Sequence, residues 1–190
     1  MPVELRSGLR LYSGSMNESI QGFAEQRQHQ RALVIELADL CLSKNCVVAT
    51  AESCTAGMIA GAMTNLAGSS AWFDCGFITY SNNAKIKMLG IEPAILRESG
   101  AVSGAVVSAM ARGAVSRSDA TIACAVSGVA GPGGGSIEKP VGTVWIAWAG
   151  PFGERQQEFR FDGDRDDIRR HTVDEAIAGL IRCINSDAES

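Results

Sequence analysis

The stretch TAESCTAG, residues 50–57, decides the fold of this chain. It stands between the apolar run CVVAT, residues 46–50, and a small-residue pattern of helical spacing over residues 58–66. A buried strand that is broken by small polar residues and followed by a helix is typical of an α/β sheet, which binds its ligands at the carboxyl ends of the strands. Ser53 is therefore the leading candidate for a nucleophile.

The role of this stretch has one further argument for a ligand site and two alternatives. The helix after it points unpaired N–H groups and the positive end of its dipole at the turn, which suits a phosphate or a developing oxyanion. Ser and Thr also favour helix starts for local reasons, so a well-capped turn without a function is the alternative. Cys54 is the rival nucleophile, although a Cys beside a strand end is more often a small buried hydrophobe.

The composition limits the class of protein. With 190 residues, of which 46% are hydrophobic, the chain can form one ordinary domain with a core. The net charge is −4 and no basic run occurs, so neither a nucleic acid nor a membrane is expected as a partner. Without a membrane-spanning window or a secretory pattern, the protein is expected to be cytoplasmic. The six cysteines are scattered and the two histidines lie in polar surroundings, so no metal and no cofactor are expected.

Hydrophobic patterning predicts the order of the elements. Residues 1–16 show neither the helical nor the strand period of apolar residues. They are assigned to a flexible leader before a single domain over residues 17–190. Helices are expected over residues 17–44, 58–66, 85–89, 103–116 and 165–185. A further short helix is expected to open at Glu92 and Pro93. Strands are expected over residues 46–50, 72–81, 121–127, 142–149 and 154–161. This order predicts the α/β class: a three-layer α/β/α domain with a mixed, mostly parallel sheet and a late antiparallel hairpin.

A glycine-rich loop, residues 128–140, follows the third predicted strand. It holds five glycines within residues 128–135, and these permit positive φ angles and a close approach of backbone N–H groups to phosphate or carbonyl oxygens. The loop matches neither the P-loop nor GxGxxG, so we expect neither an NTP hydrolase nor a Rossmann dinucleotide site. The alternative is a flexible loop, but its place at a strand end favours a ligand.

A nucleophilic serine needs a base. His29 and His171 lie away from the strand ends in the predicted order, so Lys85 is the better candidate. A lysine can accept a proton where desolvation lowers its pKa, and the alternative is an exposed helix lysine. The literal SxxK from Ser136 to Lys139 is discounted because it falls in the glycine-rich loop and not on a helix.

Five motifs occur in order along the chain: TAESCTAG, GFITYSNNAK, GAVS, SGVAGPGGGSIEKPVGTV and FDGDR. Together they resemble the CinA carboxyl-terminal domain family, which includes bacterial nicotinamide-mononucleotide deamidases, and the likeness covers about residues 28–186. The resemblance implies an amidohydrolase that converts nicotinamide mononucleotide to nicotinate mononucleotide and ammonia in pyridine nucleotide salvage. Two positions depart from the family pattern: Ala56 stands for a glycine, and Ser136 with Ile137 stands for Thr-Pro.

The resemblance also implies roles for single residues. Ser53 matches the nucleophile and Lys85 its base partner, with Tyr80 as a further catalytic candidate, and backbone N–H groups of residues 55–57 are expected to hold the oxyanion. The residues expected to bind the substrate are Glu52, Thr55, Ala56, Gly57, Asn82, Ser127, Gly128, Gly131, Gly133, Gly134 and Arg165. The alternative function is a nucleotide-binding domain without deamidase activity that acts through partners or assembly, and a homo-oligomer is left open.

Overall fold

The computed structural model describes residues 8–186, with side chains described from residue 21 onward except at position 23. The elements in chain order are α1 (Gly8–Lys44), β1 (Val48–Glu52), α2 (Met58–Thr64), η1 (Ser69–Ala71), β2 (Phe73–Ile78), α3 (Asn82–Leu89), α4 (Pro93–Ser99), α5 (Gly104–Ser116), β3 (Ile122–Gly128), β4 (Thr143–Gly150), β5 (Gly153–Arg160) and α6 (Arg165–Ser186). None of the helices described is long and apolar enough to cross a membrane.

The five strands form one mixed sheet in the order β2-β1-β3-β4-β5. β1 pairs in parallel with β2 and with β3, whereas β4 pairs antiparallel with β3 and with β5. Glu52, the last residue of β1, pairs with Ile78 of β2 and with Val126 of β3. The carboxyl ends of three parallel strands therefore meet at one edge of the sheet, where ligands bind in folds of this kind.

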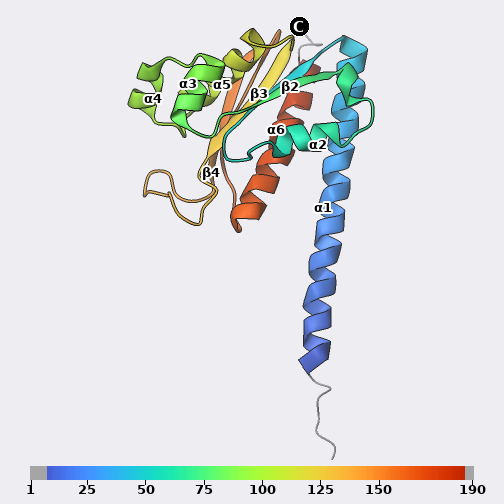
Figure 1. The fold of residues 1–190 in the computed structure, drawn as a ribbon. Coiled ribbons are helices and arrows are strands. Elements are labelled where there is room, and N and C mark those ends of the chain that lie inside the picture. Colours follow the sequence, from blue (N-terminus) through green and yellow to red (C-terminus); the bar gives the residue numbers. More distant parts are fainter. Residues whose placement is uncertain (1–7, 187–190) are drawn as a thin grey trace, which may run out of the picture.

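The two faces of the sheet carry side chains of different size, because neighbouring residues of a strand point to opposite faces. One face is built from larger residues, among them Ile122, Val126 and Ile146, and packs against α1, α2 and α6. The other face is built from alanines and packs against the helices α3, α4 and α5; these alanines are Ala49, Ala51, Ala123, Ala125, Ala147 and Ala149. Figure 1 shows the two groups of helices on opposite sides of the strands, which confirms the predicted three-layer α/β/α arrangement.

Helix α1 begins earlier than the sequence predicts. The pattern favours a helix from residue 17 after a leader over residues 1–16, but α1 begins at Gly8, so residues 8–16 belong to it. Once a helix is nucleated, each further residue adds a hydrogen bond, and no proline between residues 8 and 44 interrupts it. The rest of the expected leader, residues 1–7, lies outside the described residues.

Two boundaries near the site also differ from the predicted ones. β1 covers Val48–Glu52 and not residues 46–50, because pairing to both neighbouring strands continues up to Glu52. α3 begins at Asn82 and not at Lys85, since the Ser81 hydroxyl accepts the N–H of Ala84 at 3.0 Å and caps the helix. Ser53 is therefore the first residue after its strand, and Lys85 lies in the first turns of its helix.

Candidate active site

Ser53 and Lys85 are in direct contact, although thirty-two positions separate them in the chain. The backbone N–H of Ser53 donates to the Val126 carbonyl oxygen at 3.1 Å, which holds the serine beside β3. Lys85 reaches it from α3, with its Nζ 2.9 Å from the Ser53 Oγ. The same Nζ donates to the Thr79 carbonyl oxygen at 2.7 Å, just beyond the end of β2. Three elements thus place an amine against a hydroxyl at the carboxyl edge of the sheet.

The environment of Lys85 favours its neutral form. The residue is 1% exposed, and burial lowers the pKa of its ammonium group from the ordinary 10.5 to about 8. In the described part of the chain, no carboxylate forms an ion pair with it. About a tenth of the Lys85 side chains is therefore uncharged at pH 7, far more than for a lysine of ordinary pKa, and is able to take a proton from Ser53.

Cys54, the rival nucleophile, lies in surroundings that disfavour its reactive form. Its side chain is buried, and burial, with a smaller contribution from the charge of Glu52, raises the pKa of the Cys54 thiol to about 11. A thiol with this pKa is almost wholly protonated at neutral pH, whereas the thiolate is the nucleophile. The geometry therefore favours the serine over its neighbour.

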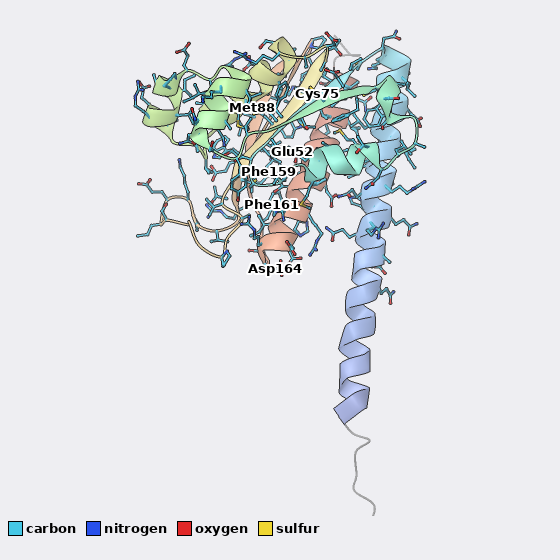
Figure 2. The ribbon with its side chains drawn as sticks, viewed as in Figure 1. Glu52, Cys75, Met88, Phe159, Phe161 and Asp164 are labelled. Atoms are coloured by element: carbon cyan, nitrogen blue, oxygen red, sulfur yellow. The ribbon has the colours of Figure 1, made fainter. Side chains whose placement is uncertain are left out.

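Glu52 organises the turn that carries the nucleophile. The side chain is 0% exposed, and its carboxylate accepts five hydrogen bonds. The donors are the hydroxyls of Thr55 at 2.6 Å and Thr50 at 3.3 Å and the backbone N–H groups of Gly57 at 2.8 Å, Ala60 at 2.9 Å and Ile59 at 3.1 Å. Figure 2 shows Glu52 beside the start of α2. Because this carboxylate occupies the amino-terminal N–H groups of α2, they are not available to a substrate.

The turn also settles which backbone donors remain for an oxyanion. Of the N–H groups of residues 55–57, that of Ala56 donates to the Ser53 carbonyl at 3.2 Å and that of Gly57 to Glu52. The N–H groups of Cys54 and Thr55 have no oxygen acceptor among the described residues and lie near the Cys54 thiol, whose pKa they lower against the larger effect of burial. Ala56 adopts φ 51°, a left-handed conformation that costs a residue with a Cβ roughly 1 kcal/mol.

Arg165, the first residue of α6, connects the glycine-rich loop after β3 to the residues that follow β2. Its guanidinium donates to the Gly131 carbonyl at 2.8 Å and to the Tyr80 hydroxyl at 3.2 Å. Tyr80 is 61% exposed, so its ring is open to solvent where it follows β2. Asn82, at the start of α3, is exposed as well. The three side chains proposed here to contact a substrate thus stand at the outer rim of the site.

The remaining residues expected to bind substrate divide between interior and surface. Thr55 and Ser127 are buried, and the Ser127 hydroxyl donates to the Ala101 carbonyl at 2.8 Å. In the loop after β3, Gly131 is buried with φ 79°, while Gly133 and Gly134 are exposed. A Cβ at Gly128 would lie 2.8 Å from the Thr143 carbonyl oxygen, so this glycine is needed for strand packing.

Two residues of the site were missed by the sequence reasoning. Arg169 on α6 donates from Nε to the Cys54 carbonyl and from Nη2 to the Thr55 carbonyl, both at 3.1 Å. Its sequence signal is its place one helical turn after Arg165, on the same face of the helix. Thr79 is fully buried; its carbonyl accepts from Lys85, and its hydroxyl has no hydrogen-bond partner in the part of the chain that the structure describes.

Neither histidine contacts the serine. His171 stacks on Phe161 with ring centroids 5.7 Å apart, and His29 lies exposed on α1. Over residues 8–186, no cluster of three or more His, Cys, Asp or Glu residues is arranged to hold a metal ion. Of the candidate bases in the sequence, the structure therefore brings only Lys85 to Ser53.

The protein is an α/β/α domain with a serine and a lysine in contact at the carboxyl edge of its mixed sheet, and these are residue types that can act as a nucleophile and its base. The family model of the CinA C-terminal domain matches residues 30–184. The chain belongs to the CinA C-terminal domain family.

Named relatives and solved structures agree with this membership. The chain is 55% identical over 141 residues to the nicotinamide-nucleotide amidohydrolase PncC of Pseudomonas putida, covering 73% of this chain and 86% of the relative. It is 50% identical over 139 residues to the protein of the same name from Escherichia coli K12, covering 73% and 84%. The crystal structure of the competence/damage inducible protein CihA from Agrobacterium tumefaciens superimposes with a TM-score of 0.79 at 46% identity, covering 82% of this chain and 95% of that one.

Proposed function

We propose that this chain is a serine amidohydrolase that converts nicotinamide mononucleotide to nicotinate mononucleotide and ammonia, in pyridine nucleotide salvage. The observation that carries the proposal is the 2.9 Å contact between the Ser53 Oγ and the Nζ of a buried lysine, Lys85. A site that only binds a nucleotide has no need of this pair. The substrate follows from the relatives named nicotinamide-nucleotide amidohydrolase, at about half identity over most of their length.

The reaction proceeds in two halves. Neutral Lys85 takes the proton of the Ser53 hydroxyl while Oγ attacks the carboxamide carbon, and the N–H groups of Cys54 and Thr55 stabilise the negative oxygen that forms. The Lys85 ammonium then returns the proton to the leaving nitrogen, and ammonia departs from an ester on Ser53. In the second half, Lys85 takes a proton from the water that attacks the ester carbon. The ester bond to Oγ then breaks, the nicotinate product leaves, and the Lys85 ammonium returns its proton to Oγ, which restores the serine.

The rim of the site suits the rest of such a substrate. Arg165 offers a guanidinium to the phosphate, because it lies exposed between Tyr80 and the glycine-rich loop. The loop offers backbone N–H groups at its exposed glycines, Gly133 and Gly134, where no side chain blocks a close approach. The carboxamide would then lie inward at Ser53 and the phosphate outward.

The proposal is tested by ammonia release. Incubated with nicotinamide mononucleotide, the full chain is expected to release one equivalent of ammonia, and with plain nicotinamide at the same concentration at least about a hundredfold more slowly, since binding energy from the phosphate supports the chemical step. A coupled glutamate dehydrogenase assay measures both rates. Binding of nicotinamide mononucleotide without ammonia release would instead favour the nucleotide-binding alternative.

The pH dependence of this activity follows from Lys85. The neutral amine is the active form, and with a pKa of about 8 only about a tenth of it is neutral at pH 7 but about nine tenths at pH 9. We therefore expect kcat/KM to rise about fivefold between pH 7 and pH 8, about twofold more between pH 8 and pH 9, and to level off above that. Initial rates at low substrate concentration between pH 6.5 and 10 measure the profile. A profile that is flat or falling between pH 7 and 9 contradicts the role of Lys85.

A further inference from the structure

We infer that Arg169 is a positioning residue that aims the oxyanion-binding N–H of Thr55 in the nucleophile turn. The inference rests on the proposed function for its catalytic meaning, and on the contacts of residues 53–57 for its geometry. Arg169 lies on α6, more than a hundred positions along the chain from the turn, and its side chain is 23% exposed.

The contact is a fork on two consecutive carbonyls. Nε of Arg169 donates to the Cys54 oxygen and Nη2 to the Thr55 oxygen, each at 3.1 Å. Hydrogen bonds from a charged donor are stronger than those between neutral groups, and the planar guanidinium fixes both acceptors together. Its third nitrogen, Nη1, lies 3.6 Å from the exposed carboxylate of Asp166, which leaves the fork free for the turn.

The two carbonyls are not equally dependent on Arg169. The Thr55 oxygen also accepts the N–H of Met58 at 3.2 Å. For the Cys54 oxygen, the guanidinium is the only hydrogen-bond donor among the described residues. The orientation of the peptide group between Cys54 and Thr55 therefore depends mainly on Arg169.

This peptide group carries the donor that the reaction needs. In a trans peptide the N–H points opposite to the C=O, so holding the Cys54 oxygen toward α6 turns the Thr55 N–H away from it. Ala56 and Gly57 donate elsewhere, and Thr55 supplies one of the two N–H groups without an oxygen acceptor in the described structure. The positive charge on the carbonyl side also polarises the peptide, which makes its N–H a better donor.

The test removes and then returns the guanidinium. In an Arg169→Ala variant, kcat for nicotinamide mononucleotide is expected to fall about a hundredfold with KM changed less than about threefold, the cost of one misplaced oxyanion donor. Guanidinium chloride at a few tens of millimolar is expected to raise the kcat of this variant at least about tenfold. Arg169→Lys has one donor group for two carbonyls, so its kcat should lie between those of Arg169→Ala and the parent.

A matched control and a second measurement make the result decisive. Arg182→Ala removes an arginine of the same helix whose ion pair in the described structure is with Glu175, so it should keep kcat and show no response to guanidinium. Independently of turnover, the amide resonance of Thr55 in a ¹H–¹⁵N spectrum should move in Arg169→Ala and return with guanidinium. Melting temperatures of all variants show that they are folded.

The inference is overturned if Arg169→Ala keeps the parental kcat, or if KM alone rises, which would place the guanidinium on the substrate. It is also overturned if the Thr55 resonance stays unmoved in the folded variant. Failure of the proposed function is separate: the parent would then release no ammonia, while the Thr55 resonance would still report whether Arg169 orients the peptide.

Discussion

Replacing Ser53 by alanine is expected to lower kcat for ammonia release at least about a thousandfold, while the melting temperature changes by no more than a few degrees. Removing the nucleophile of a serine hydrolase leaves only binding and the oxyanion donors to assist the reaction. The hydroxyl contributes little to the fold, because its one hydrogen bond among the described residues is with Lys85, while the backbone N–H of Ser53 keeps its bond to β3.

Two control variants separate this serine from its rivals. Ser136→Ala removes the serine of the literal SxxK in the exposed loop. Its hydroxyl accepts the N–H of Lys139 and no other hydrogen bond from a described residue, so the variant should leave the rate within about twofold. Cys54→Ala tests the neighbouring thiol, and iodoacetamide should not inactivate the parent. If Ser53→Ala keeps its rate while Cys54→Ala loses it, the assignment of the nucleophile is wrong.

The lowered pKa of Lys85 gives this experiment a second reading. With a pKa of about 8, the buried Lys85 amine serves in the first half-reaction as the base for the Ser53 hydroxyl, which the alanine variant lacks. The residual rate of Ser53→Ala should therefore lose the rise with pH that the parent shows below about pH 8.

Much of the fold could be predicted because its strands are apolar and its helices periodic. The alternation of strand and helix up to β3 predicts parallel pairs, and the turn after β4 predicts the antiparallel end. The limits of β1 and α3 could not be read in this way, since tertiary pairing extends β1 to Glu52 and one hydroxyl, that of Ser81, starts α3. As a result, Ser53 directly follows its strand, and Lys85 is the fourth residue of its helix and not the first.

The sheet carried a signal that a reading by apolar runs overlooks. In β1 every second residue is alanine, namely Ala49 and Ala51, and in β3 the same alternation places Ala123 and Ala125 before Ser127. These alanines lie on one face and allow the small-residue helix α5 to pack closely. Counting residue size with period two, and not hydrophobicity alone, would have assigned each face of the sheet to its helices.

The site was harder to predict than the fold because it depends on which polar groups are already used. The sequence suggests Ser53 and Lys85 by type and place, and the structure puts them in contact. The sequence does not reveal that the Glu52 carboxylate occupies the first N–H groups of α2, nor that an arginine of α6 reaches the turn. Both facts arise from contacts that no local spacing encodes.

Glu52→Ala is the variant expected to cost the most stability. It leaves the backbone N–H groups of Gly57, Ile59 and Ala60 and two hydroxyls without their acceptor, in a region where Ile59 is fully buried. Each unsatisfied buried donor costs about 1–3 kcal/mol, and water can reach only the less buried ones. We expect the free energy of unfolding to fall by about 3 kcal/mol, and the melting temperature of a chain of this size by about 10 °C.

Calorimetry or circular dichroism measures the change, and two variants calibrate it. Glu36→Ala, at an exposed position of α1, should melt within about 2 °C of the parent. Glu52→Gln keeps the shape and one oxygen of the side chain but turns an NH₂ group toward a backbone donor. Its melting temperature should therefore lie between those of Glu36→Ala and Glu52→Ala. If Glu52→Ala melted like the parent, the carboxylate would not hold the turn, and a direct contact with substrate would become its better explanation. Because the same turn carries Ser53, we also expect Glu52→Gln to lose turnover at temperatures where it is fully folded.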